Sequence, residues 1–338
     1  MGHTFREGDF VESLEGLIFD VKGLIHPPNR VVAFVRYIPD FQGTRLRDGK
    51  RYRKIYELED RYKFLTSQYP DYLVHDRVFD EDLNEVPIDR LVRHYRPLEK
   101  TEALIISHTR TGLEQKTLDM VGALSSASGV YLEEFGISGS ILVGLAEPTS
   151  DIDLVIYGSK NSNAVRQSLG KLLKEGEAFD SYHESTLLGL HKTRHRETGI
   201  PFRDYVYSEA RKDFQGLFHG TDFFIRYVKD WDEIQETYGS TTFQRIGIGK
   251  VEATVEDDRE AVFTPCSYSL GSVNILEGPR VEPLTEIISF RGQFCEQAVR
   301  CERVRAQGKI ERKNTKEGIS YRLILGNTRR DYMIVIAT

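Results

Sequence analysis

Residues 136–157 read GISGSILVGLAEPTSDIDLVIY, and this stretch decides which fold we expect. A Gly139-Ser140 pair is followed by an Asp-x-Asp run, formed by Asp151 and Asp153, that enters an apolar segment. Strand alternation places both carboxylates on one face and the intervening aliphatic side chains on the other. Because neighbouring carboxylates repel each other, a fold that keeps such a pair typically uses it to hold a hard divalent cation.

The Gly-Ser turn before the carboxylates is suited to binding phosphate. Glycine lets backbone N–H groups approach a phosphate with no Cβ in the way. A phosphate site beside a metal site indicates metal-assisted phosphoryl or nucleotidyl transfer. Two plainer interpretations stay open: the glycines serve only turn geometry, and a lone Asp-x-Asp is more often a solvated loop than a metal site.

The pattern G-S-x-x-x-G, a short gap and S-D-x-D-L resembles the signature of the polymerase-beta-like nucleotidyltransferase superfamily. Gly139 to Gly144 and Ser150 to Leu154 carry the resemblance, which covers residues 115–230. It implies an α/β core with a mixed sheet and helices, and a nucleoside triphosphate such as ATP as substrate. It also implies two Mg²⁺ ions, replaceable by Mn²⁺, held by Asp151 and Asp153. Nucleotide binding would fall to Gly139, Ser140 and Ser150.

The superfamily takes its third carboxylate from a later, neighbouring strand, and we expect Asp222 in that role. Asp222 starts the apolar run Phe223 to Val228, so its side chain would project at the sheet end beside the first pair. The alternative for Asp222 is a strand-entry residue that accepts a backbone hydrogen bond. Asp204 is the rival third ligand. Arg226 shares the expected strand face with Asp222, where it either faces phosphate or is ion-paired.

The chain of 338 residues is long enough for two or three domains. We expect an N-terminal β-rich domain over residues 1–100, the catalytic core over 101–235, and a C-terminal β barrel or sandwich over 236–338. Within the core, helices are predicted over 116–135, 163–179 and 185–196, and strands over 152–157 and 223–228. The fold class is therefore an α/β nucleotidyltransferase core between two mostly β domains.

Two regions outside the core have residues suited to nucleic acid. Residues 45–54 hold six cations around an Asp48-Gly49 turn, with Tyr52 placed to stack on a base. An exposed hairpin kept soluble by its charges explains the same pattern. The aromatic residues of the C-terminal region indicate either an oligonucleotide-binding barrel or ordinary core packing; they are Tyr268, Phe290, Phe294 and Tyr321.

Composition sets limits on these interpretations. A hydrophobic content of 39% with 29% charged residues is ordinary for a soluble globular protein. No apolar run reaches the ~20 residues that cross a bilayer, and the first residues have no apolar signal core, so we expect a cytoplasmic protein with no membrane contact. Three cysteines without a C-x-x-C pair argue against structural zinc or a disulfide framework. A net charge of −6 argues against non-specific coating of nucleic acid.

The function we expect is Mg²⁺-dependent transfer of a nucleoside monophosphate to an acceptor hydroxyl. The flanking domains and the basic 45–54 segment favour a nucleic acid end as acceptor, RNA before DNA. Transfer to a protein or a small molecule is the second hypothesis. The third is a binding module that keeps the fold without activity, which the intact Gly139-Ser140 and Asp-x-Asp residues argue against. The base preference and the oligomeric state do not follow from the sequence.

Overall fold

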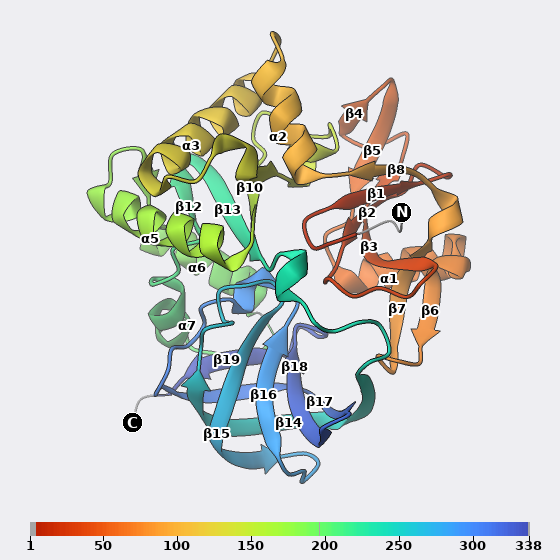
Figure 1. The fold of residues 1–338 in the computed structure, drawn as a ribbon, viewed down its shortest axis with the longest axis vertical. Helices are drawn as coiled ribbons and strands as arrows, with labels where there is room; N and C mark the ends of the chain where they lie inside the picture. The colour runs from red at the N-terminus through yellow and green to blue at the C-terminus, as the bar shows by residue number, and fades with distance from the viewer. Residues whose placement is uncertain (1–4, 196, 337–338) are drawn as a thin grey trace. The chain divides into compact units, whose positions relative to one another are not determined.

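The computed structural model describes residues 5–195 and 197–336, which form two compact units (Figure 1). Unit 1 is drawn from residues 1–76, 81–180 and 216–238. Unit 2 is drawn from residues 77–80, 181–215 and 239–338. The described chain is mixed α/β, with seven α-helices and three sheets. No helix among the described residues is long and apolar enough to span a membrane.

The first sheet of unit 1 has eight strands, all drawn from residues 10–95. Its order is β4-β5-β3-β2-β1-β8, and β7 pairs with both β3 and β6. The strands are β1 Phe10–Ser13, β2 Ile18–Val21, β3 Arg30–Pro39, β4 Arg45–Arg47, β5 Lys50–Lys54, β6 Leu73–Asp76, β7 Glu81–Pro87 and β8 Leu91–Tyr95. Helix α1 spans Leu58–Gln68. The sequence pattern of residues 88–94 weakly favours a helix, but these residues form a 3₁₀ turn followed by β8, which pairs with β1.

The second sheet of unit 1 contains the Asp-x-Asp strand. Its order is β11-β12-β13-β10-β9, with β10 parallel to β13 and antiparallel to β9. The strands are β9 Phe135–Ile137, β10 Ile152–Tyr157, β11 Phe179–Asp180, β12 Gln215–Phe218 and β13 Thr221–Val228. The helices are α2 Pro97–Ile106, α3 Gly112–Ser128, α4 Gly139–Leu142 and α5 Ser159–Glu175.

Local sequence explains these helices and strands. A capping box between Thr111 and Glu114 starts α3, and Gly129 at a φ of 74° ends it. Helix α5 packs against α3, β10 and β13 (Figure 1). The apolar side of β10 is fully buried, as its alternation predicts, while the opposite side meets the N-terminal segment. That contact is close: a Cβ on Gly8 would lie 2.7 Å from Val155 Cγ2.

The N-terminal sheet therefore packs directly on the core within unit 1. One buried cluster joins side chains of β1, β2, β3, β5 and β8 to the loop that follows α4: Phe10, Ile18, Tyr37, Tyr52, Tyr95, Leu142, Val143 and Leu145. Ser138 Oγ also donates a hydrogen bond of 2.7 Å to the Gly8 carbonyl. The three domains expected along the chain thus fall into two units, and the boundaries at 100 and 235 remain a proposal about independently folding parts.

Unit 2 contains a small β barrel. β14 pairs with β15, β15 with β16, β16 with β18, β18 with β17, and β17 again with β14, so the five strands close a ring to which β19 adds at β17. The strands are β14 Thr242–Asp257, β15 Cys266–Glu277, β16 Leu284–Ser289, β17 Arg303–Thr315, β18 Gly318–Leu325 and β19 Tyr332–Val335. Helices α6 Glu184–Arg194 and α7 Phe202–Glu209 share a buried cluster with β19.

Candidate active site

Asp151 and Asp153 lie at the start of β10, in the central part of the second sheet. Both are partly buried, and Ile152 and Leu154 on the opposite face are fully buried. Asp153 lies in register with Phe224 of the parallel strand β13. The alternation predicted from the sequence therefore holds, and the apolar face anchors the strand so that the carboxylates project from a fixed backbone.

Gly139 is in close contact with the Asp153 carboxylate. Its φ is +60°, and a Cβ at this position would lie 1.9 Å from Asp153 Oδ2. Any side chain would therefore collide with the carboxylate and strain the backbone. The Ser138 N–H also donates to the Asp153 carbonyl at 2.9 Å. The Gly-Ser turn and the Asp-x-Asp strand thus form one structural element rather than two separate motifs.

A small cavity of about 50 Å³ opens at Asp153 and Gly139. Its charged lining comes from both sheets of unit 1: Asp20, Arg36, Lys54, Asp153 and Arg226. Ligand sites that enclose a drug-sized molecule are usually about 300–1,000 Å³. The cavity is therefore suited to an ion or phosphate oxygens, and the rest of a nucleotide would lie outside it.

The electrostatics of the carboxylate pair fit a divalent cation. Burial, followed by the charge of Asp151, raises the pKa of Asp153 above its ordinary range, while Arg226, Lys54 and Arg36 oppose the rise. Within residues 5–195 and 197–336, neither side chain of the pair accepts a hydrogen bond or forms an ion pair. Adjacent oxygen donors without protein partners are the donor set that Mg²⁺ takes in proteins.

Arg226 is ion-paired, as one of the two interpretations of the sequence allowed. Its Nη1 lies 2.8 Å from Glu7 Oε1 and 3.8 Å from Asp20 Oδ1. Lys22 Nζ lies 2.8 Å from Asp20 Oδ2 and 3.1 Å from Glu7 Oε1. Although burial raises the pKa of Asp20, Lys22 and Arg226 hold it below its ordinary value. These four residues therefore neutralise one another at one wall of the cavity.

The two candidates for the third carboxylate lie in different units. Asp222 is exposed and lies in β13. The next residue, Phe223, pairs with Ile152 of β10. Asp222 and Asp151 therefore hold equivalent positions in neighbouring strands. Asp204 lies in α7 of unit 2 and accepts from Arg203 Nε at 3.2 Å. Among the residues that the structure describes, no three His, Cys, Asp or Glu side chains are grouped to hold a metal. The role of Asp222 therefore remains a proposal.

The two serines assigned to nucleotide binding differ in their contacts. Ser140 is 3% exposed, and its hydroxyl has no hydrogen-bond partner among the described residues. Ser150 Oγ accepts from the Glu147 N–H at 2.9 Å and lies 3.5 Å from Arg45 Nη1. Ser150 thus closes the turn before β10. Ser140 retains an unused hydroxyl beside the cavity residue Gly139, as a phosphate-binding serine requires.

The 45–54 segment is the predicted hairpin, with Asp48 and Gly49 at positive φ in its turn. The suggestion that Tyr52 stacks on a base was wrong, because its ring is 1% exposed. Arg47 pairs with Glu12 at 2.6 Å and donates to the Val143 carbonyl at 3.1 Å. Arg45 is buried, donates to the Leu145 carbonyl and pairs with Glu147 at 3.1 Å. These two arginines attach the hairpin to the loop that joins the Gly-Ser turn to the Asp-x-Asp strand.

Arg36 and Lys54 are the cavity cations that sequence reasoning missed. Arg36 lies in β3 outside any motif, and Lys54 was grouped with the hairpin cations. Their proximity to Asp153 depends on the packing of the first sheet on the core, for which the sequence contains no local signal.

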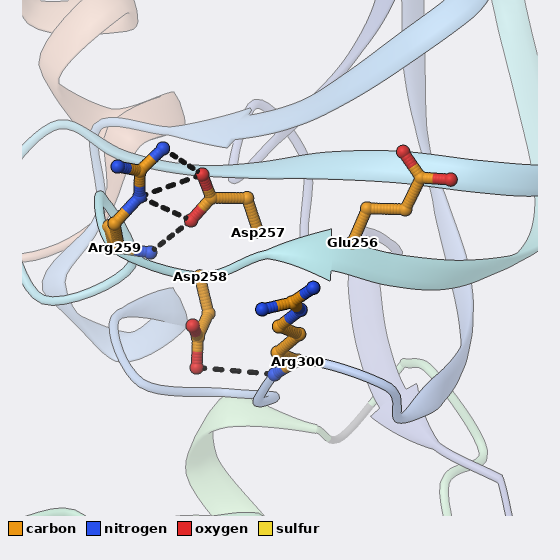
Figure 2. Close-up of a pocket in the computed structure, with 5 residues that line it drawn as sticks. All are labelled: Glu256, Asp257, Asp258, Arg259 and Arg300. Atoms are coloured by element: carbon orange, nitrogen blue, oxygen red, sulfur yellow. Dashed lines mark hydrogen bonds and ion pairs between the residues drawn. The ribbon is translucent and has the colours of Figure 1, made fainter.

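A second polar hollow, of about 440 Å³, lies in unit 2 (Figure 2). Asp257 accepts from Arg259 Nε at 2.8 and 3.0 Å, and Asp258 accepts from the Arg300 N–H at 3.2 Å. The hydrogen bonds from Arg259 lower the pKa of Asp257 to about 2. The aromatics proposed for this barrel are partly core residues, since Tyr268 and Phe294 are 0% and 2% exposed.

Comparison with known proteins agrees with the site. Residues 120–213 match the family model described as "Nucleotidyltransferase domain". Over 336 residues the chain is 28% identical to "Uncharacterized protein MJ1086" of Methanocaldococcus jannaschii, an alignment that covers 97% of each protein. No solved structure matches. The matched range includes the Gly-Ser turn and the Asp-x-Asp strand, and a nucleotidyltransferase domain at this place fits the polymerase-beta-like superfamily.

Proposed function

We propose that this protein transfers a nucleoside monophosphate from a nucleoside triphosphate to an acceptor hydroxyl, with Asp151 and Asp153 as its principal catalytic residues. One observation carries the proposal. The Asp153 carboxylate, which has no hydrogen bond or ion pair within residues 5–195 and 197–336, lies so close to Gly139 that only glycine fits there. The proposed metal-binding and phosphate-binding groups would thereby be held in contact, which is the arrangement that positioning catalysis requires.

In this proposal Asp151 and Asp153 would hold Mg²⁺, with Asp222 as a further ligand from β13. The bound metal would neutralise triphosphate charge and lower the pKa of the acceptor hydroxyl. Ser140 would donate its unused hydroxyl to a phosphate oxygen, and the backbone at Gly139 would bind the β- and γ-phosphates. The acceptor oxygen bonds to the α-phosphorus, the bond from that phosphorus to the bridging oxygen breaks, and pyrophosphate leaves with the electron pair. The hydroxyl proton is released.

The acceptor is the second part of the proposal, and RNA is our first choice. The exposed cations Lys50, Arg51 and Arg53 of the hairpin and the C-terminal barrel support a nucleic acid acceptor. One observation favours a protein or small-molecule acceptor instead. Arg45 and Arg47 are engaged inside unit 1 and Tyr52 is buried, so the hairpin retains fewer groups for a nucleic acid than its sequence indicates.

The test is a labelling experiment with the full-length protein. Each α-³²P-labelled triphosphate is incubated with Mg²⁺ and a mixture of RNA, DNA and protein, and the species that acquires label is identified. Label in RNA that depends on Asp153 supports the full proposal. Label in protein or a small molecule moves the acceptor to the second candidate, and absence of both label and pyrophosphate release for every triphosphate refutes transfer.

A further inference from the structure

Arg36 and Lys54 reach the Asp153 cavity from the N-terminal sheet. Lys54 is the last residue of β5 and lies opposite Tyr37 in the antiparallel pairing with β3. Between β2 and β3, Ile18 pairs with Tyr37 and Phe19 pairs with Val35, so Arg36 is the extra residue of a β-bulge. A bulge redirects the side chain of its extra residue. Both cations therefore line the cavity with Asp153 and Gly139.

Neither cation has a carboxylate partner of its own. Within residues 5–195 and 197–336, neither Arg36 nor Lys54 forms an ion pair or donates a side-chain hydrogen bond. Each instead lies near the ring of Tyr56, with Lys54 Nζ at 5.0 Å and Arg36 Cζ at 5.8 Å from its centroid. Arg226 and Lys22 differ, since Glu7 and Asp20 neutralise them.

Asp151 and Asp153, which carry the proposed metal site, are the acids that interact electrostatically with Lys54. Arg36 interacts with Asp153 and with Asp20, and Asp20 is already ion-paired with Lys22 and Arg226. A divalent cation on Asp151 and Asp153 would cancel their charge and leave the positive charges of Arg36 and Lys54 poorly compensated. Burial, and next the charge of Arg36, lowers the pKa of Lys54. Keeping this lysine charged and half-buried therefore reduces the stability of the fold. An anion beside the metal removes that cost.

We propose that Arg36 and Lys54 bind the β- and γ-phosphates of the nucleoside triphosphate, so that the N-terminal sheet forms one wall of the nucleotide site. This inference rests on the proposed function and assigns the triphosphate its protein ligands. The cavity has room for phosphate oxygens but not for a base or sugar, so the ligand recognised here is the polyphosphate itself. Arginine and lysine are the usual side chains for this recognition.

The test uses inorganic tripolyphosphate with Mg²⁺, which has no nucleoside to transfer, and isothermal titration calorimetry of the full-length chain. Arg36→Met and Lys54→Met keep side-chain length and remove charge. Each is expected to weaken tripolyphosphate binding about 10- to 100-fold, the range for a lost hydrogen bond from a charged donor. Lys50→Met, an exposed cation at the other end of β5, is the matched control and should change affinity less than about threefold, as a surface charge does.

A role in merely compensating Asp151 and Asp153 predicts a different pattern. Removal of a nearby positive charge should then leave Mg²⁺ binding unchanged or tighter, and tripolyphosphate affinity should match wild type. That result overturns the inference. The inference also fails if the variants bind single-stranded RNA more weakly but bind tripolyphosphate normally, or if the wild-type protein binds no tripolyphosphate. Lys54→Arg, which keeps the charge, should restore binding, and thermal unfolding of each variant separates lost contacts from lost structure.

The outcome is independent of the labelling experiment. If wild type transfers label while both methionine variants bind tripolyphosphate normally, the proposed function stands and the inference fails. If tripolyphosphate binding falls as expected but no triphosphate is turned over, the wall of the site is established and the transfer reaction is refuted.

Discussion

The two polar hollows of this molecule contain similar residues and differ in how their charges are satisfied. In unit 2, Asp257 accepts from the Arg259 guanidinium and Asp258 accepts from the backbone N–H of Arg300, while the Glu256, Arg259 and Arg300 side chains are exposed to solvent (Figure 2). In unit 1, Asp153, Arg36 and Lys54 are partly buried and face one small cavity without ion pairs among the described residues. The charges of the larger hollow are therefore hydrogen-bonded or solvated, whereas those of the smaller cavity are withdrawn from solvent without an ion-pair partner. Partly buried charges without partners mark the site that expects a ligand.

The largest effect should come from Asp153→Asn, which removes a ligand charge with little change in shape. We expect transfer to fall by several orders of magnitude, while Asp257→Asn, the matched change in unit 2, leaves the rate unchanged. Initial rates of label transfer at saturating Mg²⁺ measure both. A near wild-type rate for the doubly substituted Asp151→Asn, Asp153→Asn protein would remove the metal site from this strand.

The same substitution should stabilise the metal-free protein. Burial and Asp151 raise the folded-state pKa of Asp153, so the favourable contribution of this group is present at low pH and is lost as pH rises. Asparagine carries no charge to desolvate. In a chelating buffer at neutral pH, the melting temperature of Asp153→Asn should therefore exceed that of wild type, and the difference should shrink as pH falls.

Asp222→Asn should also reduce turnover by orders of magnitude while largely sparing triphosphate binding, because this carboxylate is proposed to act on the acceptor side. Asp204→Asn is the comparison, since Asp204 was the rival candidate and lies in α7 of unit 2. Steady-state kinetics separate kcat from KM for each variant. A larger loss for Asp204→Asn would transfer the third-ligand role to that residue.

The Asp-x-Asp strand was predictable because its signals are local. Alternation and the Gly-Ser and Asp-x-Asp spacing predicted a strand over residues 152–157, which are the bounds of β10. The region around residues 294–304 shows the opposite case. Its sequence pattern hints at a helix, but a 3₁₀ turn at Gly292–Phe294 precedes it and β17 begins at Arg303. There the pairing of β17 with β14 and β18 overrides local preference.

The cationic wall of the cavity was not predictable from the sequence. Arg36 enters it because one unpaired residue shifts the register between β2 and β3, and Lys54 because its sheet packs on the loop after α4. Both depend on partners far along the chain. The same packing places the hairpin cations Arg45 and Arg47 in ion pairs within unit 1. The sequence of the hairpin alone suggested that both were available to bind nucleic acid.

Gly139→Ala tests the contact between the turn and the strand with one methyl group. An ideal Cβ at residue 139 would lie only 1.9 Å from Asp153 Oδ2, so the new methyl group would displace the Asp153 carboxylate. The backbone φ of +60° adds strain for any residue other than glycine. A shift of about 1 Å in a catalytic group typically costs about 100-fold in rate. Gly122→Ala in α3 is the control, because nothing lies within 4 Å of its ideal Cβ. Equal activity of the two variants would show that the close approach has no catalytic role.

The smallest effect concerns Glu85, which tests how far burial of an ionisable group can be used to find sites. Glu85 lies in β7, is 2% exposed, and has no ligand cavity around it among those described. Burial, then the neighbouring Asp76, raises the pKa of Glu85 to about 8, and Arg30 opposes the rise. A raised folded-state pKa means that the stabilising contribution is complete below the ordinary carboxyl pKa and is lost as pH rises through about 8.

Glu85→Gln should therefore leave label transfer unchanged and reduce the loss of stability as pH rises from the ordinary carboxyl pKa to about 8, as measured by thermal unfolding. The acid in this position is protonated and neutral at lower pH, so it requires no counter-ion there, unlike the cations at the Asp153 cavity. Loss of transfer in Glu85→Gln with an intact fold would contradict the distinction between the two sites. A pH profile of stability identical to wild type would show that Glu85 titrates as an ordinary carboxyl.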